Sequence, residues 1–155
     1  MSEKALIHEN IIALDMQADN KENAIKQLGQ LLVDNEYINP SYIDGVLERE
    51  EKFPTGLVLA NAGIAIPHAS PNNNVMKNGI AAARLVNSVK FHSMEDPEQQ
   101  VDVNMIFILA LANSNEHLEV LKNLFVAFQN EDLVKALEAS KEKITFLNLL
   151  IQNLK

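Results

Sequence analysis

The sequence predicts an α/β domain with a mixed β-sheet of about five strands flanked by helices on both faces. Short strand-like apolar runs alternate along the chain with longer segments whose apolar residues recur at helical spacing. Residues 103–111 are apolar except for Asn104, which is typical of a central strand covered on both sides. Because the 155 residues contain no repeat, low-complexity tract or linker-like stretch, we expect one domain over residues 1–155.

The expected elements alternate along the whole chain. They are a strand over 11–14, helices over 20–35 and 40–52, strands over 63–66, 80–86, 89–91 and 103–111, and helices over 113–128, 131–138 and 141–153. This order of strands and helices is the pattern of a layered α/β fold.

Three of the helix starts carry a capping signal. Asp19 with Glu22, and Asn113 with Glu116, have the spacing of capping boxes, in which two side chains satisfy free backbone N–H groups. The Asn-Pro pair at 39–40 supplies an N-cap residue and a first-turn proline. These signals fix where the first, second and third helices are expected to begin.

The strand boundaries depend on residues that interrupt pairing. Pro67 has no backbone N–H and therefore ends the strand over 63–66, which places His68 at the exit of that strand. The Asn-Ser pair at 87–88 predicts a turn between two short strands, and residues 92–100 are interpreted as a polar loop.

Composition and charge argue against several classes of function. The 13 Lys and Arg residues against 21 Asp and Glu give a net charge of −8, which speaks against binding to nucleic acid or to an anionic membrane surface. The longest apolar run, residues 105–112, is far shorter than a membrane-spanning helix, and residues 1–8 show no secretory pattern. The chain has no cysteine, which fits a reducing compartment, so we expect a cytoplasmic protein.

Four histidines are the main candidates for chemistry. His8 lies in the N-terminal segment and His92 in a polar stretch, and both are interpreted as solvated side chains. His68 and His117 follow strand ends, where open α/β sheets hold their ligands. His68 is expected either to have an accessible ring that acts as a nucleophile or to cap local backbone. His117 lies in the first turn of a helix, a position that favours an anion, or is an ordinary surface histidine.

Arg49 is one of only two arginines in the chain, with Arg84. It either clamps an anion through its guanidinium group or belongs to a surface ion-pair cluster over residues 48–51. The adjacent acids Glu50 and Glu51 are interpreted as solvated charge, because neighbouring helical residues face different ways. A metal site with His68 and His117 as ligands is a third possibility for these histidines, but no HxH or HExxH pattern occurs, so a metal centre is not expected. The sequence also has no phosphate-loop, dinucleotide-binding or nucleophile-elbow pattern, which argues against the commonest nucleotide-binding and serine-hydrolase functions.

Several segments form a pattern that resembles a known family. The matching segments are LERE at 47–50, PTG at 54–56, GIAIPH at 63–68, and HL at 117–118 followed by Leu121. They resemble the type-2, fructose/mannitol-type enzyme IIA components of the bacterial phosphoenolpyruvate-dependent sugar phosphotransferase system, over about residues 11–150. The segments FPTGL at 53–57 and MEDP at 94–97 look closest to the galactitol-type branch of that family.

The resemblance implies a phosphotransferase with a phosphohistidine intermediate. His68 would accept a phosphoryl group from the phosphohistidine of the carrier HPr and pass it to a cysteine of a IIB partner. Arg49 and His117 match the family's phosphate-stabilising positions, and Thr55 is a further candidate for bonding the ring or the phosphate. Ala69 stands where many members have glycine, which slightly narrows the approach to the histidine.

The same resemblance implies no metal or other cofactor. The absence of cysteine and of a membrane span predicts a free-standing IIA component, with IIB and IIC on other chains and IIC contacted only indirectly. No contact with nucleic acid and no direct insertion into the membrane are expected.

Three functions stay open from the sequence. The leading hypothesis is a transport component for galactitol or a related polyol. A nitrogen-type IIA regulatory protein would have the same histidine and would signal through phosphorylation-dependent partner binding. A non-catalytic sugar-binding module would not need His68. In the first case the membrane partner is expected to recognise the sugar.

Overall fold

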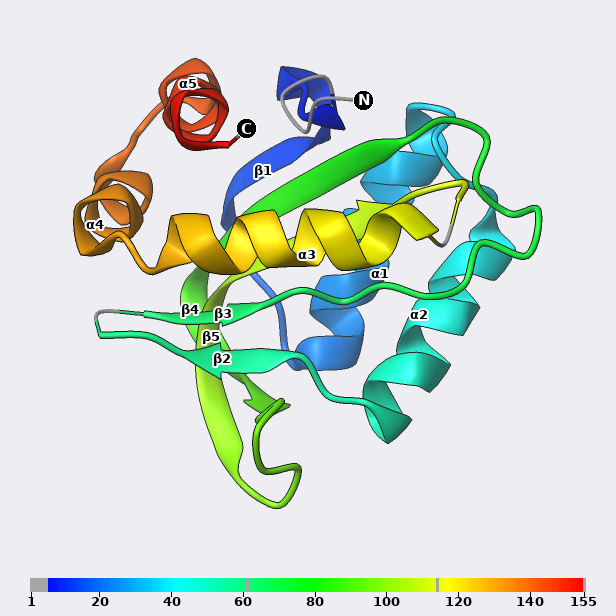
Figure 1. The fold of residues 1–155 in the computed structure, drawn as a ribbon, viewed down its shortest axis with the longest axis horizontal. Helices are drawn as coiled ribbons and strands as arrows, with labels where there is room; N and C mark the ends of the chain where they lie inside the picture. The colour runs from blue at the N-terminus through cyan, green and yellow to red at the C-terminus, as the bar shows by residue number, and fades with distance from the viewer. Residues whose placement is uncertain (1–5, 61, 114, 155) are drawn as a thin grey trace.

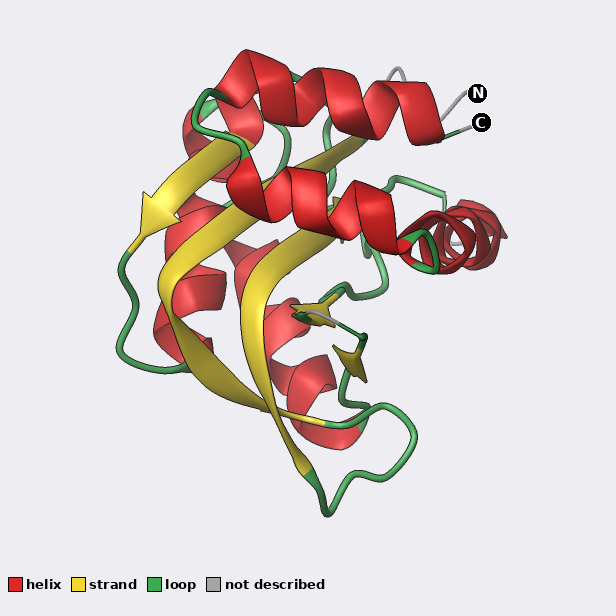
Figure 2. Cartoon of the chain, turned by 90° about the vertical axis from the view of Figure 1, so that its left-hand side faces the viewer, coloured by secondary structure: helices red, strands yellow, loops and turns green. Residues whose placement is uncertain are grey.

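The computed structural model describes residues 6–60, 62–113 and 115–154. A five-stranded mixed β-sheet has helices packed on both faces, as Figures 1 and 2 show. The strands are β1 (Ile12–Met16), β2 (Gly56–Val58), β3 (Gly63–Ala65), β4 (Gly79–His92) and β5 (Gln100–Ala110). The helices are α1 (Lys21–Asp34), α2 (Pro40–Lys52), α3 (Asn115–Phe128), α4 (Glu131–Ala139) and α5 (Lys143–Asn153), with a 3-10 turn at Glu9–Ile11. The predicted fold class is confirmed.

The sheet topology brings two strand ends together. The order across the sheet is β1-β4-β5-β3-β2. β4 and β5 form a long antiparallel hairpin, β1 is parallel to β4, and β3 is parallel to β5. β5 is therefore the central strand, as its apolar run predicts. Because β3 and β5 are parallel neighbours, the segments that leave their carboxyl ends start at the same edge of the sheet.

Each face of the sheet carries its own apolar core. One face packs against α1 and α2, and the other packs against α3, α4 and α5. Side chains of β5 alternate between the two: Ile106 and Ile108 belong to the first core, and Phe107 and Leu109 belong to the second. A strand buried on both sides leaves little room for polar side chains, which explains the apolar run at the end of β5.

The strands differ from the sequence prediction in two places. The turn predicted at residues 87–88 is wrong, because β4 is one strand whose register against β5 shifts between Arg84 and Val89. The exposed Asn-Ser pair lies on this irregular stretch, where an interrupted ladder tolerates polar residues. β2 is missing from the predicted elements, because its three residues are too short to show an alternating pattern.

The helix starts match the prediction in part. The side chain of Asn20 caps α1 by accepting a hydrogen bond of 2.8 Å from the backbone N–H of Asn23, so the capping box predicted to begin at Asp19 is wrong. Before α3, the Asn113 side chain accepts a hydrogen bond from the backbone N–H of Asn115. Within the described residues, no helix has both the length and the apolar character needed to cross a membrane.

Candidate active site

The two histidines at strand exits lie next to each other. His68 follows the end of β3, and His117 lies in the first turn of α3, which follows β5. Their ring centroids are 5.4 Å apart, and the ring planes are inclined at 62°. The parallel pairing of β3 and β5 produces this juxtaposition of residues almost fifty positions apart in the sequence.

The ring of His68 is held in one orientation. Its Nδ1 lies 2.9 Å from the carbonyl oxygen of Ile66. A carbonyl oxygen only accepts hydrogen bonds, so Nδ1 carries the proton and Nε2 keeps its lone pair. Burial, the largest effect, together with the charge of Arg49, lowers the pKa of His68, whereas the bond to Ile66 acts the other way. The ring is therefore neutral at pH 7 and has one free nitrogen.

His68 is less accessible than the sequence prediction assumed. The residue is 8% exposed, whereas the first of the two sequence-based alternatives was an accessible ring. The backbone on the N-terminal side of His68 is bonded to β5, because the Pro67 carbonyl accepts a hydrogen bond from the backbone N–H of Leu109 near the end of that strand. The small residue Gly45 of α2 faces Ala69, so the methyl group of Ala69 fits at this position.

His117 is also buried, with 9% exposure, and its Nε2 has no hydrogen-bond partner. Burial, followed by the charges of His68 and Arg49, lowers the pKa of His117 to about 4. A buried nitrogen without a partner is uncommon in folded proteins and suits a group that binds a ligand. Residue 114, directly before α3, lies outside the described residues.

Arg49 lies in the last turn of α2 and is free to bind an anion. Its Nε has no hydrogen-bond partner, and its guanidinium carbon lies 5.1 Å from the ring centroid of Phe53. Within the described part of the chain Arg49 forms no ion pair, and Glu48 pairs with Lys52 instead. The surface ion-pair interpretation of Arg49 is therefore wrong.

The other arginine is fully used elsewhere. Arg84 donates hydrogen bonds to the backbone carbonyls of Leu137, Glu138 and Ser140 at the end of α4 and approaches Asp15. It stabilises the helix terminus through its positive charge. Arg49 is consequently the arginine that remains for a ligand.

A pocket of about 300 Å³ lies at the surface beside Arg49 and His68, and His117 is not among its lining residues. It is lined by Arg49, Lys52, Phe53, Pro54, Thr55, His68, Met94, Pro97 and Leu121. The lining contains two cations and no carboxylate, so the pocket attracts an anion beside the imidazole of His68. Among the described residues there is no group of three or more side chains placed as metal ligands.

Thr55 is buried beneath this pocket. Its hydroxyl group donates a hydrogen bond of 2.8 Å to Glu50 and accepts one of 3.1 Å from the backbone N–H of Ile66. Sequence analysis expects Thr55 near the ring or the phosphate. The structure places its hydroxyl against the backbone of Ile66, the residue whose carbonyl holds His68.

Glu50 is the functional candidate that sequence reasoning missed. The prediction of a solvated carboxylate is wrong, because Glu50 is 4% exposed and burial raises its pKa to about 7. The buried residues of α2 are Tyr42, Val46 and Glu50, at intervals of four. That spacing of four is the signal by which the sequence indicates a buried glutamate.

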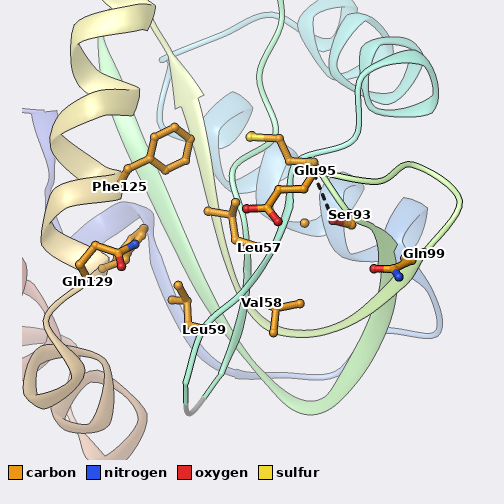
Figure 3. Close-up of a pocket in the computed structure, with 11 residues that line it drawn as sticks. Leu57, Val58, Leu59, Ser93, Glu95, Gln99, Phe125 and Gln129 are labelled. Atoms are coloured by element: carbon orange, nitrogen blue, oxygen red, sulfur yellow. Dashed lines mark hydrogen bonds between the residues drawn. The ribbon is translucent and has the colours of Figure 1, made fainter.

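A second, larger pocket does not contain the histidines. It measures about 490 Å³ and lies between β2, the loop after β4 and the end of α3, as Figure 3 shows. Its lining residues are Gly56, Leu57, Val58, Leu59, Ser93, Met94, Glu95, Gln99, Phe125, Phe128 and Gln129. The charged residue among them is the carboxylate Glu95, which does not suit an anion. The smaller pocket is therefore the candidate active site.

The chain is similar to sugar phosphotransferase components over most of its length. It is 34% identical over 147 residues to a mannitol-specific EIICBA component of Pasteurella multocida, covering 94% of this chain and 22% of that protein. It therefore spans about a fifth of such longer relatives. It is 31% identical to the mannitol-specific phosphotransferase enzyme IIA component of Bacillus subtilis, covering 90% of this chain and 92% of that protein.

Solved structures have the same fold. The enzyme IIA of mannitol from Escherichia coli, determined in complex with phosphorylated enzyme IIB, superposes with a TM-score of 0.76 and 29% identity, covering 95% and 99% of the two chains. The nitrogen regulatory protein IIA-Ntr of Neisseria meningitidis superposes with a TM-score of 0.78 and 25% identity, covering 95% and 97%.

The family comparison agrees with the resemblance noted from the sequence. The family described as "Phosphoenolpyruvate-dependent sugar phosphotransferase system, EIIA 2" matches residues 5–153. This match covers nearly the whole chain, including both histidines and Arg49, and the predicted family membership is confirmed. The chain belongs to the EIIA 2 family of the phosphoenolpyruvate-dependent sugar phosphotransferase system.

Proposed function

We propose that residues 1–155 act as one EIIA unit in which His68 carries a phosphoryl group. The donor is the phosphohistidine of HPr, and the acceptor is the cysteine of a IIB partner during sugar or polyol uptake. One observation carries this proposal: a neutral His68 with a free Nε2 lies beside Arg49 and His117, each of which has an unpartnered nitrogen.

The geometry supports His68 as the nucleophile. The lone pair of Nε2 attacks the phosphorus atom of the donor, so that a P–N bond forms at His68 while the P–N bond of the donor breaks. The leaving ring nitrogen of HPr takes the electron pair of the broken bond. The hydrogen bond from Nδ1 to Ile66 keeps the ring fixed and makes Nε2 the attacking atom.

Arg49 and His117 stabilise the negative charge of the transferred phosphoryl group. In-line phosphoryl transfer needs positioning and charge neutralisation more than covalent chemistry. The guanidinium group of Arg49, stacked on Phe53, supplies a permanent positive charge at the pocket. The unpartnered Nε2 of His117 supplies a hydrogen-bonding group beside the ring of His68, and an arriving anion favours the protonation of His117.

The family comparison supports part of the proposed set of partners. The Escherichia coli enzyme IIA structure is a complex with phosphorylated enzyme IIB, which supports a IIB acceptor for this chain. HPr is the donor that the family description implies. The relatives reported above are named for mannitol, and galactitol or a similar polyol stays our prediction for the transport system. Such partners predict a cytoplasmic location.

A regulatory role is the second candidate function. The similarity to the nitrogen regulatory protein IIA-Ntr supports it, because that protein has the same fold with a TM-score of 0.78. In this case His68 would still accept a phosphoryl group, and phosphorylation would decide which protein partner binds. The two functions therefore differ in the acceptor and share the chemistry at His68.

Phosphoryl transfer to the purified protein tests the proposal. Phosphoenolpyruvate, enzyme I and HPr are mixed with the wild-type chain or with His68→Ala, and intact masses are recorded. We expect a gain of one phosphoryl group in the wild type alone. Addition of a IIB protein should then discharge the wild type. No gain with an active donor pair contradicts both functions, and a gain without any discharge to IIB favours regulation.

A further inference from the structure

Glu50 occupies a position on α2 that the core would normally fill with an apolar side chain. It lies one helical turn after Val46 and two turns after Tyr42, and all three side chains are buried. A buried carboxylate is unfavourable unless hydrogen bonds compensate for the lost water. The contacts of Glu50 should therefore explain why a carboxylate is buried at this position.

Both carboxylate oxygens of Glu50 accept hydrogen bonds from one residue. Oε2 accepts from the backbone N–H of Thr55 at 2.8 Å, and Oε1 accepts from the Thr55 hydroxyl at 2.8 Å. The same hydroxyl accepts a hydrogen bond of 3.1 Å from the backbone N–H of Ile66, whose carbonyl in turn accepts the Nδ1–H of His68 at 2.9 Å. An unbroken chain of hydrogen bonds thus links Glu50 to the ring of His68.

The same face of α2 also holds the other side of His68. The hydroxyl of Tyr42 donates to the carbonyl of Leu109 at 2.6 Å and accepts from the backbone N–H of Ala69 at 3.2 Å. Residues 66–69 are therefore anchored to α2 on both sides of the histidine. α2 also carries Arg49, so one helix sets the backbone under the ring and places the cation beside it.

We propose that Glu50 is a positioning residue for the phosphoryl transfer at His68, acting through the Thr55 hydroxyl and the backbone of Ile66. This inference rests on the proposed function. A charged acceptor strengthens the hydrogen bond from Thr55 and with it the bond from Ile66. Because in-line transfer depends on where Nε2 points, a loosened Ile66 peptide lowers the rate without removing any group that touches the phosphate.

The charge state of Glu50 gives the proposal a pH signature. The charged groups that face it are Lys21 of α1 and its own neighbour Glu51, which pair with each other at 3.6 Å. An ionised Glu50 accepts both hydrogen bonds from Thr55, whereas a protonated Glu50 must use one oxygen as a donor. Phosphoryl acceptance should therefore rise with pH through about 7, where Glu50 ionises.

Four variants test this role. Rates of phosphoryl transfer from phosphorylated HPr are measured against donor concentration and pH for Glu50→Gln, Thr55→Val, Thr55→Ser and the control Glu51→Gln, which removes an exposed carboxylate one residue away. We expect the maximal rate of Glu50→Gln and Thr55→Val to fall by about tenfold or more with little change in KM. Thr55→Ser keeps the hydroxyl and should recover most of the rate that Thr55→Val loses. Glu51→Gln keeps the network and should react at nearly the wild-type rate.

The pH profile separates positioning from a structural role. The wild type should show the rise near pH 7. Glu51→Gln should show it at a slightly lower pH, because it removes a small negative charge effect that raises the pKa of Glu50, and Glu50→Gln should lose the rise. A wild-type rate and profile in Glu50→Gln overturn the proposal. The proposal is also overturned if Thr55→Val transfers slowly while Glu50→Gln transfers at the wild-type rate, because that result would assign Thr55 to direct contact with the phosphate. If Glu50→Gln does not fold, the comparison of Thr55→Val with Thr55→Ser still tests the hydrogen-bond chain.

A measurement without phosphoryl transfer keeps the two proposals apart. The ¹⁵N shifts of the His68 ring report which nitrogen carries the proton in the wild type and in Glu50→Gln. We expect a pure Nδ1–H tautomer in the wild type and a mixture in the variant. If wild-type protein accepts no phosphoryl group, the proposed function fails, and this spectrum still decides whether Glu50 positions the ring: identical ring shifts in both proteins contradict it.

Discussion

The two arginines have the same side chain and opposite tasks. Arg49 has an unpartnered Nε beside His68, whereas Arg84 bonds the carbonyls that end α4. Arg49→Ala should lower the rate of phosphoryl transfer by about a hundredfold, as loss of a transition-state donor does, and leave the unfolding free energy nearly unchanged. Arg84→Ala should transfer the phosphoryl group at the normal rate and lose about 2 kcal/mol of unfolding free energy.

Transfer kinetics and urea unfolding of both arginine variants check this division. Arg49→Lys, which keeps the charge and loses the fork of donors, should fall between Ala and the wild type in rate. Equal transfer rates in Arg49→Ala and the wild type would make Arg49 an ordinary surface residue.

His68 is predicted to matter for stability as well as for chemistry. Its Nδ1–H is bonded to the Ile66 carbonyl in a buried environment, so His68→Ala removes a donor and leaves that carbonyl without it. The expected cost is about 1–3 kcal/mol of unfolding free energy, in contrast to the unchanged stability that an exposed ring would give. Urea unfolding of the variant measures it, and His8→Ala, at an exposed histidine, is the control and should unfold like the wild type.

At the scale of elements, two glycines should respond differently to the same change. A Cβ on Gly63 would overlap the backbone carbonyl of Asp102, because β3 lies against β5 at this point. Gly63→Ala should therefore cost about 4 kcal/mol or more and displace His68 with its strand. A Cβ on Gly45 meets the Cβ of Ala69 at 3.5 Å, an ordinary contact, so Gly45→Ala should stabilise α2 by roughly 0.5–1 kcal/mol.

Thermal unfolding and the His68 ring resonances of both glycine variants test this contrast. A normal spectrum in Gly63→Ala would show that the strand does not set the histidine. A destabilised Gly45→Ala would show that the space between α2 and Ala69 is already full.

The elements also show what a sequence reveals about this site. Long periodic segments such as α1 and α3 and the apolar run of β5 were predictable, because many residues contribute to each pattern. The convergence of His68 and His117 depends on the parallel pairing of β3 with β5, which local patterns do not encode. Glu50 was misread because its neighbours Arg49 and Glu51 are charged, and only its place two turns after Tyr42 indicates burial.

At the scale of the whole molecule, buried groups make opposite contributions to the dependence of stability on pH. The native pKa of Glu50 is raised from 4.5 to about 7, so the native state holds more protons than the unfolded state in that window and stability falls as pH rises. The native pKa of His117 is lowered from 6.5 to about 4, and that of His68 is lowered as well. At these two histidines the unfolded state holds more protons than the native state, so their contribution makes stability fall as pH falls.

These two effects oppose each other between about pH 4.5 and 6.5, and single variants should separate them. We expect Glu50→Gln to gain stability relative to the wild type as pH rises toward 7, because the unfolded wild type ionises this carboxyl from about pH 4.5 upward while the native state keeps it protonated up to about 7. His117→Asn should gain stability relative to the wild type as pH falls from 6.5 toward 4, because the variant lacks an imidazole whose protonation the native state opposes. Urea unfolding across this range measures both differences, with Glu51→Gln as the control whose curve should run nearly parallel to the wild type. Parallel curves for Glu50→Gln as well would mean that the buried carboxyl titrates like an exposed one. Glu50 would then be ionised well below pH 7, and the rise in transfer rate expected near pH 7 would lose its cause.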